Sequence, residues 1–117
     1  ADPDAVARLA YDADLSGLIV LPTLTLHALH DPVVSYRSEA VYDALVRIAG
    51  RSHLLVQAAT DEDQHSRLAD GSYLTALAAL EAWIDSGDRP DPAAFQQDCL
   101  ARGLARGQCR FVDPAGA

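Results

Sequence analysis

The stretch that decides the fold is residues 22–34, with the sequence PTLTLHALHDPVV. The apolar run just before it, and the leucines that alternate with threonine inside it, are typical of a strand buried on both faces, as in a parallel sheet. The Asp31-Pro32 pair is a turn signal. This stretch therefore predicts a buried strand that ends near His27, followed by a loop that carries His30 and Asp31.

The segments on either side alternate between helix and strand. The spacing of apolar residues defines these segments, and Ser, Asp, Gly and Pro mark where they begin and end. In chain order the expected elements are a helix over residues 2–14 with Asp4 as its N-cap, a helix between Ser35 and Gly50, a strand over 54–58, a helix over 72–86 and a helix over 93–101. The tail after these elements is expected to be loosely held unless Cys109 anchors it.

Apolar residues at helical spacing predict which face each helix buries. The helix before Gly50 is expected to bury Val41, Ala44, Leu45 and Ile48 and to turn Arg37, Glu39, Asp43 and Arg47 toward water. The helix over residues 72–86 is expected to bury Tyr73, Leu77, Leu80 and Ile84, with Trp83 beside them. We expect these aromatic residues to be packing residues rather than substrate contacts.

The resulting order is βαβα, which predicts an α/β fold with a parallel sheet covered by helices. Two strands are too few for a stable sheet, and each of these strands has the pattern of a buried one. Each would leave an unpaired edge. We therefore expect this sheet to be completed by another chain or by an N-terminal part that is missing here.

The charge balance argues against some classes of partner. The net charge is −8, and all nine basic residues are Arg, so a nucleic acid or an anionic membrane surface is disfavoured. No apolar run approaches the roughly 20 residues of a membrane span, and no signal peptide is recognisable. We expect no cofactor, and we expect Ala1 to be a processed end or the start of a fragment.

The two cysteines, Cys99 and Cys109, leave three possibilities open. They can bond to each other, remain two unrelated thiols, or bond to another chain. If they bond to each other, they close a short loop worth roughly 3 kcal/mol in the chain-entropy model. A disulfide would suit an oxidising compartment, which points to a secreted or periplasmic protein.

Ionisable residues follow both predicted strands. Since the carboxyl ends of adjacent parallel strands meet at one edge of the sheet, the loops that carry Asp31 and His65 should lie together. These two residues are 34 positions apart, about one βα unit. A carboxylate that accepts a hydrogen bond from one imidazole nitrogen fixes the tautomer of the ring and leaves the other nitrogen as a general base.

Each of these residues also has a simpler interpretation. Asp31 can serve the turn alone, and His65 can be an ordinary exposed histidine. His27 is expected to be a packed residue of the strand, whereas His30 can line a pocket or be neutral. A metal site built from these four residues is conceivable, although they lack an HExxH pattern.

The acidic run at residues 61–63 has the composition of a solvated loop. If the run stays close to His65, its charge would raise the pKa of that histidine. A cation site there is a further possibility. Glu62 or Asp63 could also replace Asp31 as the acid if Asp31 points away.

These patterns resemble the C-terminal part of the α/β-hydrolase fold family, over about residues 17–86. Residues 22–34 look like the penultimate strand and acid loop of that family, 54–57 like the last strand, 64–66 (Gln-His-Ser) like the histidine loop and 73–83 like the terminal helix. The resemblance implies that Asp31 is the acid and His65 the base of a Ser-His-Asp triad. It also implies that residues 1–16 end a cap insertion, that 17–87 belong to the core, and that 88–117 form a C-terminal helix and tail.

The chain departs from the family in lacking a nucleophile elbow. None of its seven serines lies in a Gly-x-Ser-x-Gly pattern. The expected function is therefore that of the C-terminal chain of a serine hydrolase that cleaves small or lipid-like carboxylic esters, with the serine on a companion chain. The alternatives are a non-catalytic acidic α/β interaction subunit that pairs through its sheet edge, and a hydrolase-fold subunit that has lost its activity.

Overall fold

The computed structural model of the chain describes residues 2–13 and 15–113. The helices are α1 (Pro3–Ala13), α2 (Arg37–Ile48), α3 (Asp70–Ser86) and α4 (Phe95–Ala101), and the strands are β1 (Thr23–Ala28), β2 (Leu55–Thr60) and β3 (Phe111–Val112). The chain thus has the expected α/β class. Within these described ranges no helix is both long enough and apolar enough to cross a membrane.

The sheet contains the predicted parallel pair and one strand that was not expected. β1 and β2 pair in register from Thr23 opposite Leu55 to Ala28 opposite Thr60. β3 adds to the far side of β2 in the antiparallel sense. Its two residues are too few to produce a periodic pattern, so it escaped the sequence analysis. The described part of the tail, up to Asp113, is therefore attached to the sheet, and within residues 2–13 and 15–113 the outer edges of both β1 and β3 lack a neighbouring strand.

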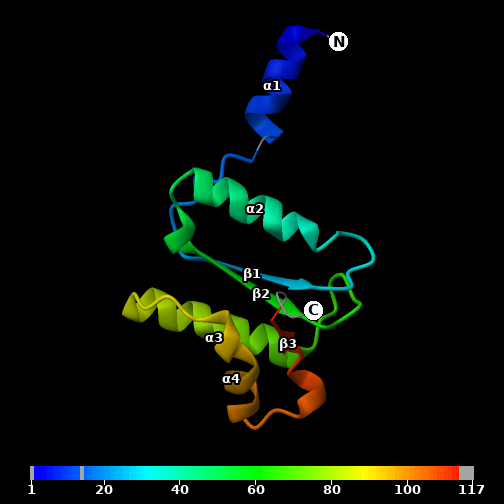
Figure 1. Cartoon of the computed structure of the whole chain (residues 1–117), viewed down its shortest axis with the longest axis vertical. Helices are drawn as coiled ribbons and strands as arrows, with labels where there is room; N and C mark the ends of the chain where they lie inside the picture. The colour runs from blue at the N-terminus through cyan, green and yellow to red at the C-terminus, as the bar shows by residue number, and fades with distance from the viewer. Residues whose placement is uncertain (1, 14, 114–117) are drawn as a thin grey trace.

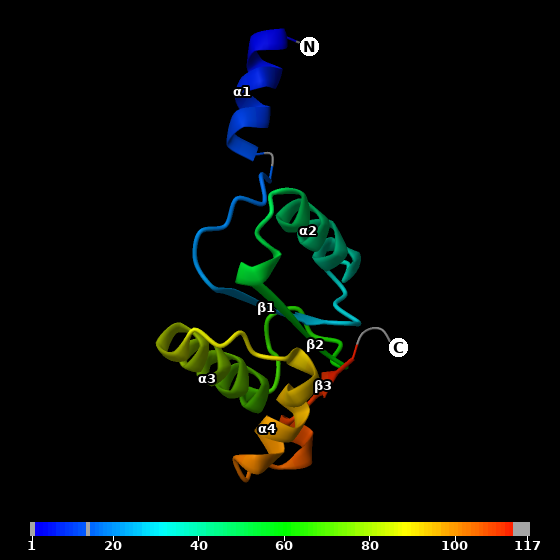
Figure 2. The same cartoon turned by 60° about the vertical axis from the view of Figure 1, so that its left-hand side comes forward.

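Helices cover both faces of this sheet (Figure 1). α2 lies over one face, and α3 and α4 lie over the other. The second view, in Figure 2, shows α1 standing away from the sheet at one end of the molecule. As a result the radius of gyration is 16.2 Å, whereas a compact domain of 100 residues has roughly 13 Å.

The hydrophobic core lies on the α3 and α4 side of β2. Its buried members are Val56, Ala58, Trp83, Phe95, Cys99, Cys109 and Phe111. The cysteines are joined in a disulfide within the chain, which decides among the three possibilities that the sequence left open. The rings of Phe95 and Phe111 meet edge to face. This disulfide and this ring contact explain how so short a strand as β3 is held.

The predicted inner faces of α2 and α3 are partly wrong. Val41 and Ile48 are 58% and 83% exposed, whereas Val46 is fully buried. In α3, Tyr73, Leu77 and Ile84 are also exposed, although Trp83 is buried as expected. The sheet has only three strands, so it is too narrow to cover the whole apolar face of each helix.

The helix ends follow the expected signals with one difference, at the start of α1. α2 and α3 end before Gly50 and Gly87, both of which have positive φ. At the start of α1, however, Asp2 accepts the hydrogen bond from the Asp4 amide, so Asp2 takes the capping role predicted for Asp4. Ser35 accepts a bond from the Arg37 amide near the start of α2.

Candidate active site

The loops after β1 and β2 meet at one edge of the sheet, as the parallel topology requires. Two backbone hydrogen bonds join them directly. The Leu29 amide donates to the Thr60 carbonyl at 2.8 Å, and the His30 amide donates to the Glu62 carbonyl at 3.2 Å. These bonds continue the strand pairing beyond the strands, so the first loop is held against the start of the second.

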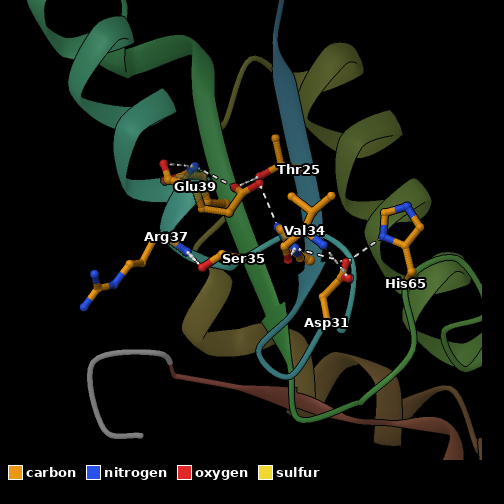
Figure 3. A network of polar contacts seen from close by, with 9 residues as sticks. Thr25, Asp31, Val34, Ser35, Arg37, Glu39 and His65 are labelled. Carbon is orange, nitrogen blue, oxygen red and sulfur yellow. Dashed lines mark hydrogen bonds and ion pairs between the residues drawn. The ribbon is translucent and has the colours of Figure 1, made fainter.

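This arrangement brings together Asp31 and His65, the two residues predicted to share a site (Figure 3). His65 Nδ1 lies 2.7 Å from Asp31 Oδ2. The Asp31 side chain is only 2% exposed, whereas that of His65 is 47% exposed. The carboxylate is thus sheltered, and the imidazole stands at the surface.

The other oxygen of Asp31 is fixed by the backbone of its own loop. Asp31 Oδ1 accepts hydrogen bonds from the amides of Val33 at 2.7 Å and Val34 at 2.9 Å. Asp31 therefore stabilises the turn, as the simpler interpretation predicted, and the same turn aims its second oxygen at His65. The two interpretations of this residue are compatible.

These contacts set the ionisation of Asp31. Desolvation by burial acts to raise its pKa, but the hydrogen bonds from Val34, His65 and Val33 together outweigh it, so the pKa lies well below its ordinary value. An ionised carboxylate can only accept hydrogen bonds, so His65 Nδ1 must carry a hydrogen. His65 Nε2 has no hydrogen-bond partner in residues 2–13 and 15–113, and on a neutral ring it would present a lone pair to the surface.

The acidic run after β2 is only in part the solvated loop that its composition suggested, because Asp61 and Asp63 are exposed and Glu62 is not. Glu62 is only 8% exposed, and its Oε1 accepts a hydrogen bond from the Ala69 amide at 2.7 Å. Asp61 instead pairs with Arg110, next to β3. The run therefore anchors the two ends of the His65 loop. Asp31 does not point away from His65, so neither Glu62 nor Asp63 is needed in its place.

His27 is packed, as expected, with 12% of its side chain exposed, and polar groups surround it. Its Nε2 lies 3.1 Å from the Val34 carbonyl oxygen and 3.3 Å from Asp31 Oδ2. Its Nδ1 lies 3.4 Å from Glu39 Oε1, so Glu39 does not face water as predicted. Thr25 and Gln57 both donate to Glu39 Oε2, and Figure 3 shows Thr25, Glu39 and Asp31 in this one network.

A signal for this network was present in the sequence. Thr25 and His27 are two residues apart, so they share one face of β1, and Gln57 stands opposite Thr25 in β2. Polar residues that recur on one face of a buried strand need partners. The sequence analysis missed this group because the shared partner, Glu39, lies on α2. Only the fold brings α2 to that face of the sheet.

The remaining candidate residues are not gathered into a metal site. Among the described residues no group of three His, Cys, Asp or Glu side chains is arranged to hold a metal ion. His30 lies outside the Asp31–His65 pair and lines a surface hollow of about 450 Å³ together with Glu62 and Arg110.

Comparison of the chain with protein-family models, with curated proteins and with solved structures gives no match.

Proposed function

We propose that Asp31 and His65 are the acid and the base of a serine hydrolase that cleaves carboxylic esters, with the serine on a companion chain or segment. The observation that carries this proposal is the 2.7 Å contact between His65 Nδ1 and Asp31 Oδ2. It joins an exposed imidazole to a sheltered, anchored carboxylate. Such a pair leaves Nε2 available to a hydroxyl from outside.

The reaction uses this pair in two stages. The serine hydroxyl attacks the acyl carbonyl while His65 Nε2 takes its proton and then transfers it to the leaving alcohol. In the second stage His65 takes a proton from a water molecule as that water attacks the acyl carbonyl, and it then returns the proton to the serine oxygen as the carboxylic acid leaves. Throughout, Asp31 keeps the His65 ring in one tautomer and stabilises its cationic form. The ester substrate is inferred by analogy with the fold class.

The outer edge of β1 supports the existence of the companion. Beside this edge, a groove of about 170 Å³ is lined by Leu24, Leu26, Tyr73, Ala76, Leu77 and Leu80. An unpaired strand next to exposed apolar side chains favours pairing with a further strand. Strands added there would extend the parallel sheet and bring their own carboxyl-end loops to the edge that carries His65.

The same edge also supports the alternative function, a non-catalytic α/β subunit that binds its partner through β1. This alternative assigns no chemistry to His65, so the two functions differ in what the partner carries. The hydrolase requires a reactive serine within reach of His65 Nε2, whereas the interaction subunit does not.

A serine-directed fluorophosphonate distinguishes them when it is added to the purified assembly, with intact-mass analysis of each chain. We expect covalent label on one serine of the companion and ester turnover that the label abolishes. His65→Ala should lower turnover by about 10⁴-fold or more, with assembly unchanged. His53→Ala is the matched control, because His53 is an exposed histidine at the opposite end of β2. Absence of label on every chain of a folded assembly would overturn the hydrolase proposal.

A further inference from the structure

A second carboxylate–imidazole pair lies behind the first. Glu39 and His27 repeat the arrangement of Asp31 and His65, and His27 Nε2 is 3.3 Å from the same Oδ2 that His65 Nδ1 contacts. All of these side chains except His65 are mostly buried. The four residues thus form a continuous chain from α2, through β1, to the surface at His65.

The surroundings of His27 determine where its hydrogens lie. Nε2 faces two acceptors, the Val34 carbonyl and the Asp31 carboxylate, so it must carry a hydrogen. Nδ1 lies 3.4 Å from Glu39 Oε1. The N–H of Nε2 therefore faces the Val34 carbonyl and the Asp31 carboxylate.

Glu39 is itself held from two directions. Thr25 donates to its Oε2, and Gln57 Nε2 donates to both its Oε2 and its backbone carbonyl. These donors come from β1 and β2, so the carboxylate of Glu39 is fixed to the sheet. The position of the His27 ring is fixed in turn, with the Tyr36 ring packed edge-on against it.

Polar groups surround both oxygens of the Asp31 carboxylate. Oδ1 accepts from the Val33 and Val34 amides, and Oδ2 accepts from His65. His27 Nε2 lies 3.3 Å from the same Oδ2, although its hydrogen bond goes to the Val34 carbonyl. Rotation of the Asp31 carboxylate would therefore break hydrogen bonds at Oδ1 and Oδ2 and take Oδ2 away from the His27 ring.

We propose that His27, held by Glu39, is a positioning residue that fixes Asp31 Oδ2 and thereby orients His65. This inference rests on the proposed hydrolase function for its effect on turnover, but the contact itself can be measured without turnover. The His27 side chain touches the acid and not the reacting atoms.

The test uses the full chain in its assembly, with ¹⁵N-labelled histidine, and follows the imidazole resonances by NMR together with kcat and KM. His27→Leu removes the donor. His27→Gln keeps an amide nitrogen where Nε2 stands. We expect His27→Leu to expose the His65 Nδ1 hydrogen to exchange, so that its resonance broadens or disappears, and to lower kcat by about ten- to a hundred-fold with KM little changed. His27→Gln should restore most of both signals, and His53→Gln should leave both unchanged.

Glu39→Gln is the second variant, in case His27→Leu fails to fold. It keeps the volume of the side chain and replaces an acceptor by an amide. We expect the His27 Nδ1 resonance to change and the His65 Nδ1 hydrogen to exchange faster. A His65 resonance identical to that of the wild type in folded His27→Leu or Glu39→Gln protein would overturn the inference. Loss of the His65 signal in an assembly that fluorophosphonate does not label would uphold the positioning contact and overturn the hydrolase function.

Discussion

The Asp31 carboxylate closes a turn with one oxygen and contacts the proposed base with the other. Its Oδ1 closes the turn after β1 through the Val33 and Val34 amides, and its Oδ2 faces His65. The Asp-Pro turn signal and the candidate acid are therefore one feature of the sequence. What local sequence could not reveal is the supporting residue Glu39, because its carboxylate reaches His27 from a helix 12 positions further along the chain.

The depressed pKa of Asp31 predicts how stability depends on pH. The folded-state pKa lies below the ordinary value of 3.8 for an aspartate, so the contribution of Asp31 is fully present above that value and is lost as pH falls toward the folded-state pKa. The difference in unfolding free energy between wild type and Asp31→Asn should therefore shrink as pH falls from about 5 to about 2. Urea unfolding of both proteins across this range measures it. A difference that stays constant with pH would contradict the prediction.

At the scale of elements, the parallel pairing of β1 and β2 does the most to create the site. Six consecutive residue pairs keep the strands in register, so the two following loops start side by side. α2 connects β1 to β2 and lies close to the segment that leads into β1. At this close approach, Gly17 has a φ of +67° and lies against the backbone of Leu45 in α2.

Gly17→Ala should destabilise the chain more than Gly50→Ala does. Both glycines have positive φ, but a Cβ at Gly17 would lie 2.4 Å from the Leu45 carbonyl group, whereas one at Gly50 would meet nothing within 4 Å. The Gly50 variant should lose about 1–2 kcal/mol from the backbone conformation alone. Denaturant unfolding of the two variants separates the steric cost from this conformational cost. Equal losses would mean that the approach to Leu45 costs nothing.

The disulfide between Cys99 and Cys109 holds β3 in place. Cys99 and Cys109 are separated by 10 positions, so the bond constrains the unfolded chain by about 3 kcal/mol. The Cys99→Ser, Cys109→Ser double variant should lose about this much stability. It should also show faster amide exchange at Asp61, whose N–H donates to the Arg110 carbonyl. Wild type treated with reductant is the control and should behave as the double variant does; unchanged exchange at Asp61 would show that β3 is held by other contacts.

Viewed as a whole, the molecule leaves many large apolar side chains exposed. Large apolar side chains are exposed on α2, on α3 and in the segment before β1, among them Leu18, Val20, Val41, Ile48, Leu74 and Leu77. Beside the free edge of β1, the groove that contains Leu77 gathers such side chains in one place, and an apolar patch of this kind marks an interface. We therefore propose a larger sheet.

This surface predicts that the chain associates with a second chain or segment. Leu77→Glu places a charge in the groove beside β1 and should abolish the association while the helices remain folded. Leu9→Glu is the control, because Leu9 is equally exposed on α1, away from the sheet. Analytical ultracentrifugation with circular dichroism measures both properties. A wild-type chain that is folded and monomeric with no second chain present would contradict the proposal.

The sequence by itself determined the order of the four helices with β1 and β2, and the meeting of Asp31 with His65. Both follow from patterns within short segments, combined with the rule that parallel strands deliver their following loops to one edge. Only the tertiary structure decided the burial of Glu62, the addition of β3, the pairing of Glu39 with His27 and the exposed faces of α2 and α3. Each of these features depends on which distant segment lies against a given side chain. The local pattern of residues does not contain that information.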